Sequence, residues 1–161
     1  MKLFVALFLS IDGYLKNFYK RFSSRQENFL KMNYKGFKDL NCYIEARALR
    51  IYISTLVKKF PSSEKYLLVN QIVDCSRSIT RNIAEGYGRY TNNDTKNFFI
   101  IARGSTTETI EQLITSFDEK FINEEELKIG EEKCELVFKL INGYIKYLDQ
   151  FKNNISNKKI L

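Results

Sequence analysis

The stretch N-E-E-E-L-K-I-G-E-E-K-C-E-L-V-F-K-L-I-N-G-Y-I-K-Y-L-D-Q, Asn123–Gln150, decides the fold. Its apolar side chains recur every seven residues, which is typical of a helix that buries one face. These side chains are Leu127, Cys134, Val137, Phe138, Ile141, Tyr144, Ile145 and Leu148. Asn123 can cap the helix, and Glu124–Glu126 place negative charge where the helix dipole favours it. The stretch therefore predicts a long amphipathic helix from about Asn123 to Phe151.

Upstream of it, residues 34–59 show a second helical pattern, with apolar side chains at steps of three to five residues. We expect the buried stripe of this segment to consist of Phe37, Leu40, Ile44, Ala48, Ile51 and Leu56. The pattern ends at Phe60-Pro61, because the residue before a proline is pushed out of helical geometry. Ser62 or Ser63 can then cap the next helix.

Two more helical segments lie between these, at residues 64–85 and 91–117. The first of the two should bury Leu68, Ile72, Ile79 and Ile83, and the second Phe98, Ile101, Ala102, Ile110 and Leu113. Gly86 and Gly88 follow the first, and glycine suits the left-handed residue that commonly ends a helix. Thr91, with Asp94 three residues later, gives the next helix a start that is similar to a capping box.

Four helices of about twenty residues or more, joined by short connections, must run antiparallel to their neighbours. The sequence therefore predicts an all-α protein, an antiparallel up-down-up-down four-helix bundle over residues 32–151. Residues 152–161 form a polar tail, which we expect to be frayed.

Residues 1–31 do not continue the bundle pattern. The apolar run Leu3–Ile11 is too short to span a bilayer as a helix, and no small-residue cleavage site follows it. Met32 stands directly before the first helical pattern. Three interpretations stay open: a start placed too early, with Met32 as the true start, a loosely packed arm, or an export or membrane signal. The first is favoured.

The composition argues against catalysis. The chain has no histidine, which removes the usual general base near neutral pH and the commonest metal ligand. Neither a nucleophile–base pair nor a cofactor motif is visible, so we expect no enzyme, no cofactor and no metal. The cysteines Cys42, Cys75 and Cys134 each lie within a predicted helix and are expected to be buried in a reduced, cytoplasmic protein.

Positive charge suggests nucleic acid as a partner. The net charge is +7, but residues 1–31 contribute six basic and two acidic residues, which is +4 of it. Within the bundle, basic residues gather around the turn between the second and third helices, where they could bind phosphates. They are Arg77, Arg81, Arg89, Lys96 and Arg103. An ordinary solvated surface is the competing interpretation.

Polar residues also follow the second helix on one side of its apolar stripe. They are Gln71, Cys75, Ser78, Asn82 and Glu85, with a matching set in Ser105, Glu108 and Gln112 on the third helix. If the two helices are antiparallel, these rows should meet in a hydrogen-bonded network that fixes register. A catalytic pair of Glu85 and Glu108 is disfavoured, because a di-iron bundle needs histidines. Gly104 indicates the close approach of another helix, within the bundle or between subunits.

Several of these segments carry a family resemblance. Phe60–Leu68 and Ser78–Arg89, taken with Ile101–Ser105, resemble the bacterial four-helix-bundle family encoded in intervening sequences of 23S rRNA genes, often labelled S23 ribosomal protein. The residues that match the family motif are Asn82, Glu85, Gly86, Gly88, Gly104, Ser105 and Glu108. The resemblance implies packing and turn roles for them, a homopentamer, and no enzymatic activity.

The family is also similar to the accessory protein of diversity-generating retroelements, which binds nucleic acid and a reverse transcriptase. Val73 and Asp74 stand where family members often carry two arginines, which weakens nucleic-acid binding at that place, although Arg77 and Arg81 can substitute. We therefore expect a non-catalytic oligomer that binds RNA or DNA and no membrane. The alternative is a structural or protein-partner module, for example for a reverse transcriptase, without nucleic-acid binding.

Overall fold

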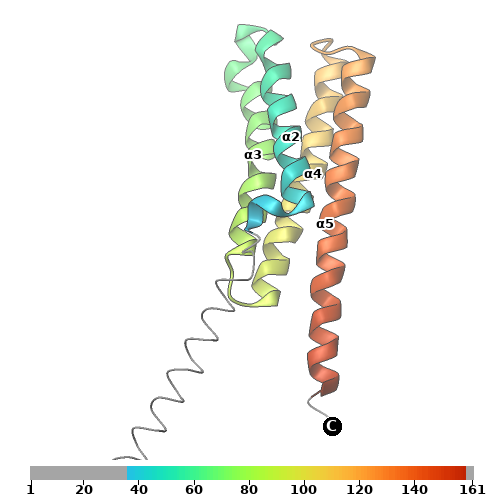
Figure 1. Cartoon of the computed structure of the whole chain (residues 1–161). Helices are drawn as coiled ribbons and strands as arrows, with labels where there is room; N and C mark the ends of the chain where they lie inside the picture. The colour runs from blue at the N-terminus through green and yellow to red at the C-terminus, as the bar shows by residue number, and fades with distance from the viewer. Residues whose placement is uncertain (1–35, 159–161) are drawn as a thin grey trace, which may run out of the picture. The chain divides into compact units, whose positions relative to one another are not determined.

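The computed structural model describes the backbone of residues 36–158 and the side chains of residues 36–150. The interpretations of residues 1–31 and of Met32 as a start concern residues outside this described part. Within residues 36–158, four α-helices run antiparallel to their neighbours (Figure 1): α2 (Asn41–Leu56), α3 (Leu68–Tyr87), α4 (Asn92–Asp118) and α5 (Glu124–Lys158). Short 3-10 helices flank α2 and precede α3: η1 (Phe37–Asp39), η2 (Val57–Lys59) and η3 (Ser62–Tyr66). The predicted all-α four-helix bundle is confirmed.

Two of the three predicted helix caps are present. The predicted cap at Ser62 or Ser63 was wrong, since both residues lie in η3 and α3 begins at Leu68 without a side-chain cap. The Thr91 hydroxyl accepts a hydrogen bond from the backbone N–H of Asp94 at 3.1 Å, at the start of α4. At the start of α5, Asn123 Oδ1 accepts from the N–H of Glu126, and Glu126 Oε2 accepts from the N–H of Asn123, both at 2.9 Å. These reciprocal bonds satisfy N–H groups that a helix end leaves without partners. The helix α5 continues to Lys158, beyond the predicted end near Phe151.

The core lies along the axis of the bundle and follows two of the predicted stripes closely. On α3 the four predicted residues are buried: Leu68, Ile72, Ile79 and Ile83. From the seven-residue repeat of α5, the buried side chains are Cys134, Val137, Ile141, Ile145 and Leu148. Phe99 of α4 is fully buried and stacks on Tyr144 of α5, with ring centroids 4.3 Å apart. Burial of these stripes is the main source of stability in such a fold.

The stripe predicted for α2 was largely wrong. Ile44 and Ile51 are each 48% exposed and Ala48 is exposed, whereas the buried face consists of Cys42, Ala46, Leu49, Ile53 and Leu56. This helix carries apolar side chains on two faces, so periodicity alone could not show which face the bundle would cover. Ile101 of α4 is likewise 50% exposed, because α4 turns Phe99 and a row of threonines and serines inward.

Gly86 also differs from the prediction. It lies inside α3, Gly88 follows the helix with φ −79°, and none of the described glycines has a positive φ. A Cβ atom on Gly86 would come within 2.8 Å of Phe98 Cβ and 3.1 Å of the Phe99 ring. Glycine is therefore needed here for the close approach of α3 and α4, and the predicted left-handed helix end was wrong.

Candidate nucleic-acid interface

The predicted polar network forms between α3 and α4 around Ser78. Its hydroxyl accepts hydrogen bonds from Ser105 Oγ at 2.8 Å and from Asn82 Nδ2 at 3.0 Å. One turn away, the Thr109 hydroxyl donates to Cys75 Sγ at 3.2 Å. Ser105, Asn82 and Cys75 are buried, so these short polar side chains satisfy one another inside the interface.

The rest of the polar row lies outside this network. Gln71 and Gln112 line a common hollow near the α4–α5 turn. Glu85 is exposed and forms an ion pair with Arg89, and Glu108 is exposed. Glu85 and Glu108 therefore have separate surroundings. The motif residue Gly104 faces open space, since no atom of the described residues lies within 4 Å of the position that a Cβ atom would take there. The close helix approach expected at Gly104 within the bundle was therefore wrong.

The three thiols are buried and free. Burial raises the pKa of Cys42 to about 11 and that of Cys134 to about 12, and it also raises the pKa of Cys75. With these raised pKa values, the three thiols stay protonated near neutral pH. Because only the thiolate acts as nucleophile or metal ligand, the three side chains behave as small apolar groups. Within the part of the chain that the structure describes, no three His, Cys, Asp or Glu side chains are grouped to hold a metal ion.

The five basic residues predicted to bind phosphates point in different directions. Lys96 forms an ion pair with Asp149 of α5, with Nζ 2.7 and 2.9 Å from the carboxylate oxygens. Arg103 donates to Asn142 Oδ1 of the same helix at 3.2 Å. Arg89 forms its ion pair with Glu85 and lies over the Phe98 ring, 4.4 Å from the centroid. Each of these three side chains therefore bonds to another residue of the bundle.

Arg77 and Arg81 are exposed, and they line a groove between α2 and α3. The groove has a volume of about 510 Å³ and is lined by Phe37, Tyr43, Arg50, Ser54, Arg77, Thr80, Arg81 and Ala84. None of these lining residues is acidic. The structure thus brings two of the five predicted residues together and adds a third arginine, Arg50, from α2.

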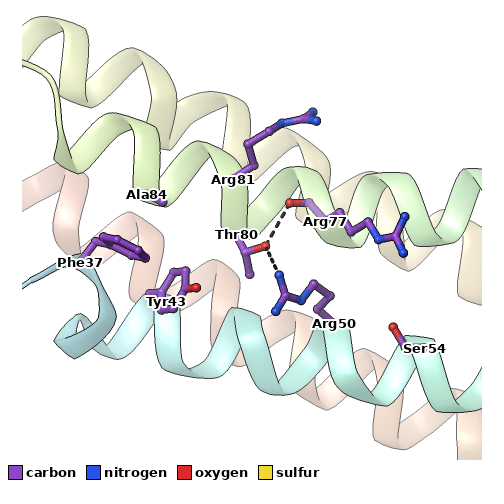
Figure 2. A pocket seen from close by; sticks show the side chains of 8 residues that line it. All are labelled: Phe37, Tyr43, Arg50, Ser54, Arg77, Thr80, Arg81 and Ala84. Carbon is purple, nitrogen blue, oxygen red and sulfur yellow. Dashed lines mark hydrogen bonds between the residues drawn. The ribbon is translucent and has the colours of Figure 1, made fainter.

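Thr80 holds Arg50 in place across the groove (Figure 2). Arg50 Nη1 donates to Thr80 Oγ1 at 3.3 Å, and the Thr80 hydroxyl donates to the carbonyl of Arg77 at 3.0 Å. Thr80 is only 3% exposed, so its hydroxyl has a fixed orientation. A guanidinium group has five N–H donors, and one bond to Thr80 leaves the others available to an anion.

Sequence reasoning missed Arg50 because it placed the buried stripe of α2 on the wrong face. With Cys42, Ala46, Leu49 and Ile53 inward, Arg50 falls beside the core and next to α3. The sequence did contain a signal for this residue, since Arg50 is a basic side chain on the helix that precedes Arg77 and Arg81. Only the correct rotation of α2 turns that signal into a site.

Within residues 36–158, no helix combines the length and the apolar character that crossing a membrane requires.

Comparisons with known proteins agree on the family. A model of the 23S rRNA-intervening sequence protein family matches residues 38–143. The crystal structure of a protein of unknown function from the S23 ribosomal protein family of Bacteroides thetaiotaomicron is similar, with a TM-score of 0.63 and 24% identity over 68% of this chain and 98% of that chain. That likeness concerns the fold alone, and no curated protein matched the sequence. Because the family model covers most of the chain, the protein belongs to the 23S rRNA-intervening sequence protein family.

Proposed function

We propose that this protein is a non-catalytic, self-associating helical bundle that binds nucleic acid through the basic groove between α2 and α3. One observation carries the proposal: Arg50, Arg77 and Arg81 line one groove and form no ion pair with any residue between 36 and 150. Arginine suits this task, because its planar group matches phosphate oxygens and is only weakly hydrated.

The distribution of acidic side chains supports the same groove. The other basic residues of the predicted set have partners inside the bundle, so binding an external phosphate would require breaking those contacts. The acids of α3 are Asp74, about one turn before Arg77, and Glu85, about one turn after Arg81. Neither lines the groove, and Glu85 forms its ion pair with Arg89. An approaching phosphate therefore meets Arg50 and Arg77 in the groove, and Arg81 adds a third positive charge at its edge (Figure 2).

A charge-removal variant tests the proposal. We expect Arg50→Gln/Arg77→Gln/Arg81→Gln to lose about tenfold in affinity for a structured RNA at low salt, measured by fluorescence anisotropy. The slope of log K against log salt should become shallower by about 2, since each phosphate contact contributes about 0.7 to 0.9.

The matched control removes the same charge from another surface. Lys128, Lys139 and Lys146 are exposed on α5, spaced so that they share its outer side. Changing all three to Gln should leave most of the affinity intact. Equal losses in the two triple variants, or binding by the wild type that is indifferent to salt, would contradict the proposed groove.

An apolar surface supports self-association. On α2, Ile44 and Ile51 are 48% exposed, and on α5, Ile129 is 37%, Leu136 43% and Tyr147 54% exposed. The spacing is seven residues on α2 and seven and eleven residues on α5, each close to a whole number of helical turns, so each set forms a stripe along one side. Apolar stripes of this kind usually mark a protein–protein interface.

The two stripes adjoin each other. Lys133 of α5 lies over the Tyr52 ring of α2, with Nζ 5.9 Å from its centroid, and the Tyr52 hydroxyl donates to the carbonyl of Glu126 at 2.6 Å. Ile51 precedes Tyr52, and Leu136 lies about one turn after Lys133. The stripes thus border one α2–α5 contact and form a surface that a second copy could cover.

Analytical ultracentrifugation tests this part. Ile51→Glu/Leu136→Glu should dissociate the assembly, for which five copies are proposed from the family resemblance, while Lys139→Glu on α5 should leave its mass unchanged. A wild-type protein that sediments as a monomer at micromolar concentration would exclude self-association. It would favour the second candidate, a cytoplasmic module whose apolar surface binds another protein such as a reverse transcriptase.

A further inference from the structure

The groove between α2 and α3 has two chemically different ends. Arg50, Arg77 and Thr80 occupy its middle, whereas two aromatic rings, Phe37 and Tyr43, lie at one end (Figure 2). The two rings meet edge to face, with centroids 4.9 Å apart and planes at 85°. Both side chains are only partly buried. An aromatic platform beside fixed cations is more than phosphate binding alone requires.

A small residue keeps the aromatic end open. Ala84 lines the groove from α3 at that end, where a longer side chain would project into the space near the rings. Along α2, the lining residues extend from Tyr43 to Ser54, a span of about 16 Å at the helical rise. The volume of about 510 Å³ lies within the range of about 300 to 1,000 Å³ that is usual for pockets that hold drug-sized ligands.

We propose that this groove binds single-stranded nucleic acid, with one base against Tyr43 and Phe37 and the adjoining phosphates on Arg50, Arg77 and Arg81. The inference rests on the proposed nucleic-acid function and specifies its substrate class. A base in a duplex is stacked between its neighbours and cannot offer its face to a protein ring. An unpaired base can, and stacking on an aromatic side chain adds affinity without base selectivity.

Other anions fit this groove less well than a nucleic-acid strand does. Inorganic phosphate or an acidic peptide would engage the arginines but would leave Tyr43 and Phe37 without a planar partner. For those ligands, Tyr43 would contribute little to affinity. The role of the aromatic end therefore separates a nucleic-acid strand from an anion of another class.

The first experiment compares a single-stranded RNA with a hairpin duplex of equal length, using the full chain. We expect the wild type to bind the single strand about tenfold more tightly. Ala84→Leu fills the aromatic end without changing charge, and leucine is nearly as good a helix former as alanine. This variant should lose the single-strand preference and keep its duplex affinity and salt slope.

The second experiment places the fluorescent base 2-aminopurine in the single strand. Wild-type protein should quench its fluorescence on binding, because the base stacks on a ring. Tyr43→Leu, which keeps an apolar side chain against the core, should bind about tenfold more weakly and quench less. Arg50→Gln should weaken binding but preserve the quenching at saturation.

The outcomes distinguish this inference from the proposed function. If the wild type binds RNA with a steep salt dependence, but Ala84→Leu and Tyr43→Leu bind single strands as it does, the base-stacking groove is wrong and the basic groove stands. If the wild type binds neither RNA, both fail. If an acidic peptide competes as well as the single strand does, the assignment to nucleic acid is overturned.

Discussion

The helix α3 packs closely against α4 on one side and leaves an open groove toward α2 on the other. Toward α4, α3 presents Ser78, Asn82 and Gly86, and the interface closes until the Ser78 and Ser105 hydroxyls are 2.8 Å apart. Toward α2, it presents Thr80 and long basic side chains, and a groove of about 510 Å³ stays open. Short polar groups can satisfy one another in a narrow gap, whereas arginines need more space and are left open to water or to an anion. The α3–α4 side therefore stabilises the fold, and the α2–α3 side is the one for which binding is proposed.

The largest expected effect tests how tightly the α3–α4 side is closed. Gly86→Ala should lower the free energy of unfolding by about 2 kcal/mol, since the new methyl group would meet Phe98 Cβ, which cannot rotate away. The control Gly104→Ala has open space and should raise it by about 1 kcal/mol through helix propensity. Urea unfolding measures both, and a stability gain at Gly86 would contradict the closed interface.

Alkaline pH offers the next test, because the bundle core, which the closed side helps to seal, excludes water from Cys134 of α5. Burial raises the pKa of Cys134 from 9.0 to about 12, so the unfolded chain loses the thiol proton at lower pH than the folded one. Stability is therefore fully present below pH 9 and falls as the pH rises toward 12. Near pH 10.5 the expected loss from this thiol is about 2 kcal/mol. Cys134→Ala should show a shallower decline, and parallel curves for the two proteins would argue against a water-excluded thiol.

A double-mutant cycle measures the polar network itself. Ser78→Ala should cost about 1 to 2 kcal/mol, because it leaves the Ser105 hydroxyl without its acceptor in a buried position. Adding Ser105→Ala removes that unsatisfied group, so the double variant should cost less than the sum of the single ones by about 1 kcal/mol. Additive losses in thermal unfolding would mean that the two hydroxyls do not depend on each other.

The smallest effect on stability is expected on the open side. Thr80→Val removes the hydroxyl that orients Arg50, but the guanidinium can be hydrated in the groove, so the loss should be only about 0.5 kcal/mol. RNA affinity should fall about threefold, because Arg50 is no longer held before binding. A stability loss as large as that of Ser78→Ala would remove the contrast between the two sides of α3.

Much of the fold could be read from local patterns. The caps at Thr91 and Asn123 depend only on residues within one turn, and the stripe on α3 has apolar residues on one face alone, so both were predicted correctly. The polar rows on α3 and α4 also predicted a network, and Ser78 and Ser105 form it. Local chemistry sufficed wherever a single arrangement satisfied it.

The site could be read only in part. Arg77 and Arg81 were found as basic residues, yet residues near them in sequence, such as Arg89, have their own partners on other faces. Arg50 was missed because α2 offers two apolar faces, and the position of the neighbouring helices decides which one is buried. Closeness along the chain does not fix the side of a helix on which a charge meets a neighbour.

The sequence by itself determined four antiparallel helices, the caps of α4 and α5 and the stripes of α3 and α5, since these follow from local chemistry, helical periodicity and short connections. Only the tertiary structure decided the rotation of α2, the packing role of Gly86 and the grouping of Arg50 with Arg77 and Arg81. These features depend on contacts between residues far apart in the chain. Packing against a neighbour selects one of several faces that the sequence leaves equally available.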